Sequence, residues 1–171
     1  MRQQGVTLIQ LLFAAALLGL LTQLSIPAYN HMSDGLLRQA AANDLAQALR
    51  SARSEALLRN STVRLEALES DWSNGWRMLL EDDDGPQLLL EWRTNGRTVI
   101  VGNRPVSRQV TFSGLGVAVL EAGGFQAGTL HVCQRPEALS HYQVVLSRSG
   151  RISLRDALFE QPLCAAAGSA H

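Results

Sequence analysis

The hydrophobic pattern changes its period along the chain and so separates a helical part from a part made of strands. Residues 6–26 form one apolar run, whose only polar side chains are those of Thr7, Gln10, Thr22, Gln23 and Ser25. No Asp, Glu, Lys or Arg occurs between Arg2 and Asp34. Because a helix of about 20 apolar residues crosses a bilayer, we expect residues 6–28 to form a transmembrane segment.

The alternative interpretation of this run is a secretory signal peptide. A signal peptide has a shorter apolar core, a cleavage site of small residues and an unrelated sequence after it. In this chain the helical pattern continues instead over residues 29–60. The apolar side chains there recur at steps of three and four, at Leu37, Ala41, Leu45, Ala48, Ala52 and Ala56.

The second helical half is therefore predicted to be amphipathic and to end at Asn60 and Ser61. Pro27 and Gly35 predict a bend or an interruption in the helix. We expect the alanine-rich stripe to pack against a sheet, and the alternative is a binding surface for a partner.

Residues 61–171 show short strand-like segments separated by Gly, Asn, Asp and Pro. The predicted strands are 62–68, 76–80, 88–92, 98–101, 109–112, 129–133, 142–146 and 151–154. So many strands after one long helix predict an α+β fold, with one or two antiparallel sheets packed on the helix.

Composition limits the classes of function. The chain has 171 residues, which is enough for one compact domain and an accessory element. Its 15 basic residues, all Arg, balance 15 acidic ones, so no overall charge directs the chain to nucleic acid. Cys133 and Cys164 have no companions at metal-ligand spacing, which predicts a disulfide; two free buried thiols are the alternative.

No arrangement of residues in the sequence indicates an active site. The four histidines, His31, His131, His141 and His171, share no zinc-ligand spacing, and no nucleophile or phosphate-binding motif is present. The run 82–84 lacks the alternating ligands of a calcium loop and predicts a hairpin turn. Trp72 and Trp76 are interpreted as a packed turn, with a ligand platform as the alternative. We expect no enzyme, no cofactor and no metal.

The N-terminal stub resembles the leader of type IV prepilins. Met1-Arg2-Gln3-Gln4-Gly5 precedes the apolar run, Thr7-Leu8-Ile9 is similar to the conserved run of that class, and Pro27 occupies its usual position. The resemblance implies that a prepilin peptidase cuts between Gly5 and Val6 and that the new N-terminus is methylated. Gln10 stands where pilins carry a Glu that pairs with a neighbour's N-terminal amine. Its lost charge favours a subunit at the filament tip or in a low-copy priming complex.

Several motifs in the second part resemble the GspH/FimT family of minor pilins and pseudopilins. They are the segments 71–76, 81–85, 110–116, 130–133 and 147–151. The resemblance implies a type IV pilin-like fold, a single-pass anchor in the bacterial inner membrane and a periplasmic domain at residues 61–171. It implies a FimT/FimU-like minor pilin, with other minor pilins and the assembly platform as partners and a place at the pilus tip. The alternative member is a minor pseudopilin of type II secretion.

Three arginines form the one candidate ligand-binding patch. Alternation along a strand would place Arg151, Ser153 and Arg155 on one solvent face, with Arg148 close by across the Gly150 turn. Guanidinium groups in this arrangement suit phosphate. Some FimT-like proteins are DNA receptors with a C-terminal G-R-x-R motif, of which only Gly150-Arg151 matches here, because Ser153 replaces the second Arg. An ordinary polar strand face is the alternative.

Overall fold

A computed structural model describes the backbone of residues 8–82, 84–133 and 138–165, and the side chains of these residues except 22–31. Contacts divide the chain into two compact units, residues 1–37 and residues 38–171. Each unit is described by itself.

The helix α1 (Leu8–Arg59) belongs to both units. Of the bend or interruption predicted near Pro27 and Gly35, the interruption is wrong, because the backbone is helical at both residues. A proline removes one backbone donor and crowds one carbonyl, while the turns on either side keep their own hydrogen bonds. The helix ends at Arg59, as predicted from Asn60, whose φ of 48° is left-handed.

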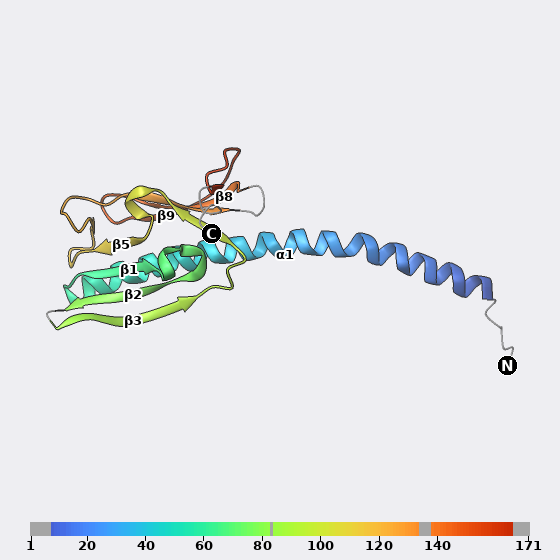
Figure 1. Cartoon of the computed structure of the whole chain (residues 1–171), viewed down its shortest axis with the longest axis horizontal. Coiled ribbons are helices and arrows are strands. Elements are labelled where there is room, and N and C mark those ends of the chain that lie inside the picture. Colours follow the sequence, from blue (N-terminus) through green and yellow to red (C-terminus); the bar gives the residue numbers. More distant parts are fainter. Residues whose placement is uncertain (1–7, 83, 134–137, 166–171) are drawn as a thin grey trace. The chain divides into compact units, whose positions relative to one another are not determined.

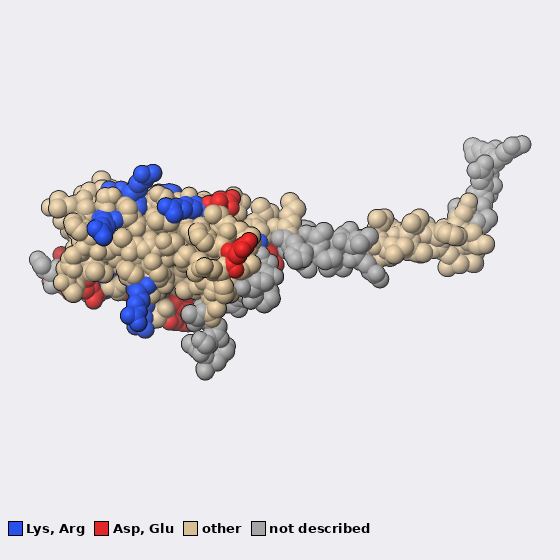
Figure 2. Space-filling model, turned by 90° about the horizontal axis from the view of Figure 1, so that it is seen from above, with Lys and Arg blue, Asp and Glu red and all other residues tan. Residues whose placement is uncertain are grey.

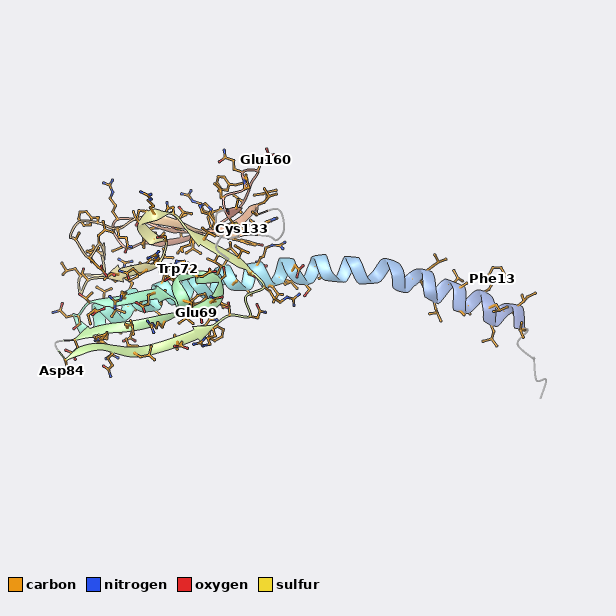
Figure 3. The ribbon with its side chains drawn as sticks, viewed as in Figure 1. Phe13, Glu69, Trp72, Asp84, Cys133 and Glu160 are labelled. Carbon is orange, nitrogen blue, oxygen red and sulfur yellow. A yellow bond between two sulfur atoms is a disulfide. The ribbon has the colours of Figure 1, made fainter. Side chains whose placement is uncertain are left out.

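The apolar side chains of residues 8–21 are exposed along α1. Phe13, which projects from the helix in Figure 3, is 70 % exposed and Leu8 is 75 % exposed. Over the part of the chain that the structure describes, no helix combines the length and the apolar character needed to cross a membrane. The segment predicted at 6–28 includes residues 6 and 7 and side chains 22–28, which lie outside the described residues.

Residues 38–171 contain two antiparallel sheets (Figure 1). The five-stranded sheet has the order β3-β2-β1-β5-β6, and the four-stranded sheet has the order β4-β7-β8-β9. The first consists of β1 (Val63–Ala67), β2 (Gly75–Asp82), β3 (Gly85–Arg93), β5 (Gln109–Phe112) and β6 (Ala118–Val119). The second consists of β4 (Val99–Gly102), β7 (Gly128–Cys133), β8 (Ser140–Leu146) and β9 (Ile152–Phe159).

Three short 3-10 helices connect these strands: η1 (Leu68–Ser70), η2 (Trp72–Asn74) and η3 (Arg104–Val106). The side chain of Asp71 caps η2 by accepting a hydrogen bond of 2.8 Å from the backbone N–H of Ser73. The hydroxyl of Ser73 in turn accepts from the backbone N–H of Ile100 at 3.0 Å. The turn therefore joins the start of β2 to the open edge of β4.

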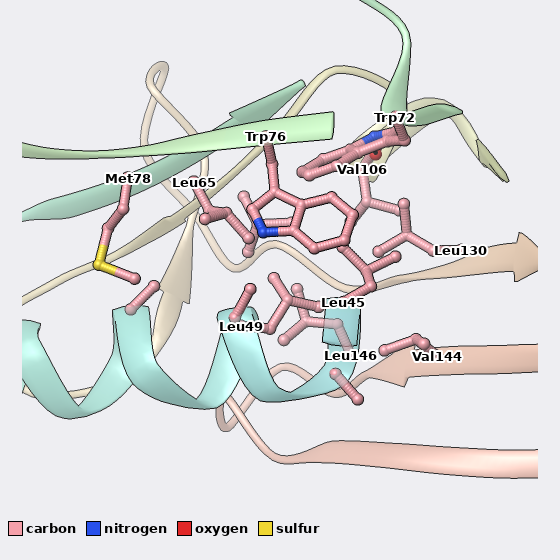
Figure 4. Close-up of a cluster of buried hydrophobic side chains, with 14 of the residues drawn as sticks. Leu45, Leu49, Leu65, Trp72, Trp76, Met78, Val106, Leu130, Val144 and Leu146 are labelled. Carbon is pink, nitrogen blue, oxygen red and sulfur yellow. Dashed lines mark hydrogen bonds between the residues drawn. The ribbon is translucent and has the colours of Figure 1, made fainter. Parts of the chain in front are cut away.

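The core lies where α1 meets the inner faces of both sheets. Figure 4 shows Leu45 and Leu49 of α1 in one cluster with Trp76 of the five-stranded sheet and Leu146 of the four-stranded sheet. Of the predicted stripe, Leu45, Ala48, Ala52 and Ala56 are buried, while Leu37 and Ala41 are partly exposed. These four residues belong to the main core, which confirms that the stripe packs against the sheets. The small side chains of the three alanines let the helix approach the sheets closely.

All eight predicted strands are present in the structure, with shifts at their ends. The sequence did not predict β6, a strand of two residues between Gly116 and Gly123. Its two residues pair with Thr111 and Phe112, and its other side is met by an isolated bridge from Phe125 to Val119. A strand this short has no alternation that a sequence pattern could reveal.

Candidate functional site

The residues predicted to be processed and assembled lie at the start of the chain. Gly5 and Val6 are outside the described residues. Gln10 lies in the first turn of α1 and its side chain is exposed. Pro27 is inside α1, and its side chain is outside the described residues. The cleavage site and the assembly contacts therefore remain predictions.

The predicted disulfide joins Cys133, the last residue of β7, to Cys164 (Figure 3 labels Cys133). Their Cα atoms are 6.3 Å apart, and the bridge spans a sequence separation of 31. Both cysteines are buried with Val99, and Val101 and Ala138 pack against this small second core. The bridge holds the chain after β9 against the end of the four-stranded sheet.

A polar network lies next to this bridge. Nδ1 of His131 is 3.1 Å from the hydroxyl of Ser140, which accepts a hydrogen bond of 2.8 Å from the side-chain amide of Gln143. The same amide donates to the carbonyl of Ala157 in β9 at 2.8 Å. Burial lowers the pKa of His131 below its ordinary value of 6.5, because the charged ring would lose hydration.

The three predicted arginines lie on the β8–β9 hairpin. Arg148 is exposed in the connecting turn, Arg151 is exposed just before β9, and Arg155 is exposed within β9. Ile152 and Leu154 are partly buried and pack against the main core. The predicted alternation is present only in part, because Ser153 is partly buried like its two neighbours and all residues from Arg155 to Phe159 are exposed. None of the three guanidinium groups forms an ion pair with a residue that the structure describes.

The connecting turn is tightly closed. The backbone N–H of Gly150 donates to the carbonyl of Ser147 at 3.0 Å, and that of Arg151 donates to the hydroxyl of Ser147 at 3.0 Å. The hydroxyls of Ser147 and Ser149 are also 3.0 Å apart. Gly150 has a φ of +76°, a conformation that favours glycine.

Arg53 of α1, which belongs to no motif in the sequence, contacts this turn. Its Nε donates to the carbonyl of Gly116 at 2.8 Å, and its Nη2 donates to the carbonyl of Ser149 at 3.3 Å. The sequence contains one indication of this contact, because Arg53 directly follows Ala52 of the apolar stripe. A long charged side chain at the edge of a buried helix face can reach polar groups at the rim of the core.

Charge elsewhere on the domain is mixed. On the five-stranded sheet, Arg64 forms ion pairs with Glu66 at 3.2 Å, Glu81 at 3.0 Å and Glu121 at 3.7 Å, and Arg77 pairs with Glu66. Figure 2 shows basic and acidic side chains together on one face of the domain. The face that Figure 2 shows is therefore not uniformly positive.

The tryptophan pair and the acidic run 82–84 have structural roles in the domain. Trp72 and Trp76 are 1 % and 2 % exposed and belong to the main core, which confirms the packed-turn interpretation. β2 and β3 pair from Gly75↔Arg93 to Asp82↔Gly85, so the predicted hairpin is present, with Asp82 at the end of β2 and Asp84 in the turn; Asp83 lies outside the described residues. Among the described residues no group of three or more His, Cys, Asp or Glu is placed to hold a metal ion.

Comparison with known proteins agrees with this arrangement. The sequence profile of a family described as "Type II transport protein GspH" matches residues 41–150. No curated protein matches the chain significantly.

Two crystal structures of the type IV minor pilin FimU of Pseudomonas aeruginosa are similar in fold. The first is 22 % identical with a TM-score of 0.58, and the match covers 72 % of this chain and 98 % of that one. The second is 21 % identical with a TM-score of 0.55, covering 72 % and 93 %. These structures share the helix packed on antiparallel sheets, and the profile covers more than half of the chain. The chain belongs to the GspH/FimT family of type IV pilin-like proteins.

Proposed function

We propose that this protein is a FimT/FimU-like minor pilin that primes pilus assembly with other minor pilins and sits at the pilus tip. Its role is structural and it catalyses no reaction. Residues 6–28 anchor it in the bacterial inner membrane, residues 29–60 continue the helix, and residues 61–171 form the periplasmic domain. The assembly platform and the prepilin peptidase are its further partners.

The observation that carries this proposal is that the apolar side chains of α1 are buried in one part of the helix and exposed in another. The apolar side chains between Ala42 and Ala56 are buried in the domain core. Large apolar side chains between Leu8 and Leu21 are exposed, at 58 % to 75 % of their surface. An apolar helix surface of this length is stable only in lipid or against other apolar helices. An inner membrane and then a filament core provide these two environments in turn.

The low-copy role is inferred from Gln10. A carboxylate at this position would pair with a neighbour's N-terminal amine inside an apolar filament. The amide of Gln10 cannot supply that charge pair. Repeated incorporation into the shaft is therefore disfavoured.

Immunogold labelling of native pili tests the proposal. Tip labelling, with loss of pili or of twitching when the gene is deleted, is the expected result. Labelling along the whole shaft would contradict the minor-pilin role. Normal pili combined with a block in protein secretion would support the pseudopilin alternative, which the family's description as a type II transport protein favours.

A second candidate function is DNA binding in natural transformation, through Arg148, Arg151 and Arg155. It is supported by their shared exposure on one hairpin and by the absence of carboxylate partners among the described residues. Three cations give weak, salt-sensitive affinity for a phosphate backbone.

A gel-shift titration of the full chain in detergent tests the second candidate. Arg151→Ala/Arg155→Ala is compared with Arg93→Ala, a matched exposed arginine that is ion-paired to Glu91 at 2.9 Å. The double substitution should weaken retention of double-stranded DNA and reduce the log-log salt slope by about 0.9 for each lost phosphate contact. Equal retention by all three proteins would exclude this patch.

A further inference from the structure

Three segments that are far apart in the sequence meet at Arg53. They are the last turns of α1, the turn 113–117 after β5, and the turn 147–150 between β8 and β9. Arg53 is partly buried and lies at the junction. Its two hydrogen bonds go to carbonyls of two different turns, Gly116 at 2.8 Å and Ser149 at 3.3 Å.

The two turns also touch each other directly. A Cβ added to Gly150 would lie 2.1 Å from the carbonyl oxygen of Gly116 and 3.2 Å from Nε of Arg53. A Cβ added to Gly116 would lie 2.9 Å from the side chain of Leu57 on α1. The turns therefore fit against each other and against the helix with no room for side chains between them.

Arg53 forms no ion pair with the carboxylates that the structure describes. Hydrogen bonds from a charged donor are stronger than those between neutral groups. A guanidinium can reach two acceptors in fixed directions, which an ammonium cannot do. These properties suit a link between two backbone turns.

We propose that Arg53 is a positioning residue: it fixes the turn 147–150 against the turn 113–117 and so sets how Arg148 and Arg151 are presented to a ligand. Its charge acts on two backbone carbonyls and makes no contact with the ligand. The proposal rests on the second candidate function only where DNA binding is measured. Hydrogen exchange at the two turns tests the role of Arg53 without any ligand.

The experiment uses the full chain in detergent with Arg53→Met, which keeps an unbranched apolar stem, and Arg53→Lys. The matched control is Arg50→Met, because Arg50 is an exposed arginine one turn earlier on α1. Hydrogen exchange is measured at the amides of Gly116, Gly150 and Arg151. The amides of Val110 in β5 and Val144 in β8 report on the sheets.

Arg53→Met should raise exchange at Gly150 and Arg151 about tenfold and leave Val110 and Val144 unchanged, as expected for loss of a charge-assisted bond. Arg53→Lys should restore protection partly, because one ammonium cannot bond both carbonyls in the same geometry. Equal exchange in Arg53→Met and Arg50→Met would overturn the proposal.

DNA retention, measured on the same proteins by gel shift, separates positioning from contact. A positioning role predicts that Arg53→Met weakens retention in wild type but adds no further loss to a chain that already carries Arg148→Ala/Arg151→Ala. A further loss in that background, with a salt slope reduced by about another 0.9, would mean that Arg53 itself contacts phosphate and would overturn the proposal. If wild type retains no DNA, the second candidate function fails, and the exchange rates alone decide the role of Arg53.

Discussion

The indole Nε1 of Trp72 donates a hydrogen bond of 3.0 Å to the backbone carbonyl of Val106. Both residues are buried, and 34 positions separate them in the sequence. The bond joins η2, before β2 of the five-stranded sheet, to η3, which follows β4 of the four-stranded sheet. It is one of several buried polar links in the domain, together with the bond from the backbone N–H of Ile100 to the hydroxyl of Ser73.

Trp72→Phe should destabilise the domain by about 1–3 kcal/mol, because the buried carbonyl of Val106 loses its indole donor. The measurement is the free energy of unfolding in denaturant. Trp92→Phe is the control, because Trp92 is 49 % exposed on the edge strand β3. This substitution should lower the free energy of unfolding by less than about 0.5 kcal/mol. Equal losses for both substitutions would contradict a role for the Trp72 bond.

The disulfide should contribute to the stability of the domain. Replacing Cys133 and Cys164 together by Ser should lower the free energy of unfolding by roughly 3 to 4 kcal/mol, since the bridge closes a loop of about 30 residues. The wild-type protein in reductant should have the same free energy of unfolding as the double variant. An unchanged midpoint in both cases would show that the bridge adds nothing to stability.

Gly150 should tolerate alanine less well than Gly123. Both glycines have a positive φ, +76° at Gly150 and +85° at Gly123, so alanine is strained at both positions. Only Gly150 has a neighbour in the way, the carbonyl oxygen of Gly116 at 2.1 Å from the added Cβ, whereas nothing lies within 4 Å at Gly123. Thermal unfolding should show a clearly lower midpoint for Gly150→Ala, and similar midpoints would mean that the two turns do not touch.

Stability should depend on pH through His131. Burial lowers its pKa in the folded protein, so the unfolded chain binds a proton at a higher pH than the folded chain does. The stability from neutral His131 is fully present above the unfolded value near 6.5. It decreases as the pH falls through that value and is lost below the folded pKa.

The measurement compares the free energy of unfolding of wild type and His131→Gln between pH 7.5 and pH 5. The variant should lose less stability over this interval, because its side chain does not titrate. Identical pH dependence in the two proteins would show that His131 is not held in its neutral form.

The sequence predicted the elements that have regular periods. The stripe from Leu45 to Ala56 carries a periodic burial signal and is present in the structure. The alternation in β9 is present only in part, because Ser153 is partly buried together with Ile152 and Leu154. The role of Arg53 could not be predicted in this way, because it depends on two turns more than 60 residues further along the chain. β6 was missed because two residues carry no period. The long helix was predicted, but the interruption that Pro27 left open is absent, because the turns on both sides keep their own hydrogen bonds.

The most direct test of the central claim is mass spectrometry of pili sheared from the native host. The minor-pilin account predicts a peptide that begins at a methylated Val6, present in the pilus fraction in far smaller amounts than the main pilin. A chain that still begins at Met1 in a peptidase-positive cell, or one that is missing from sheared pili while pili form normally without it, would contradict the account.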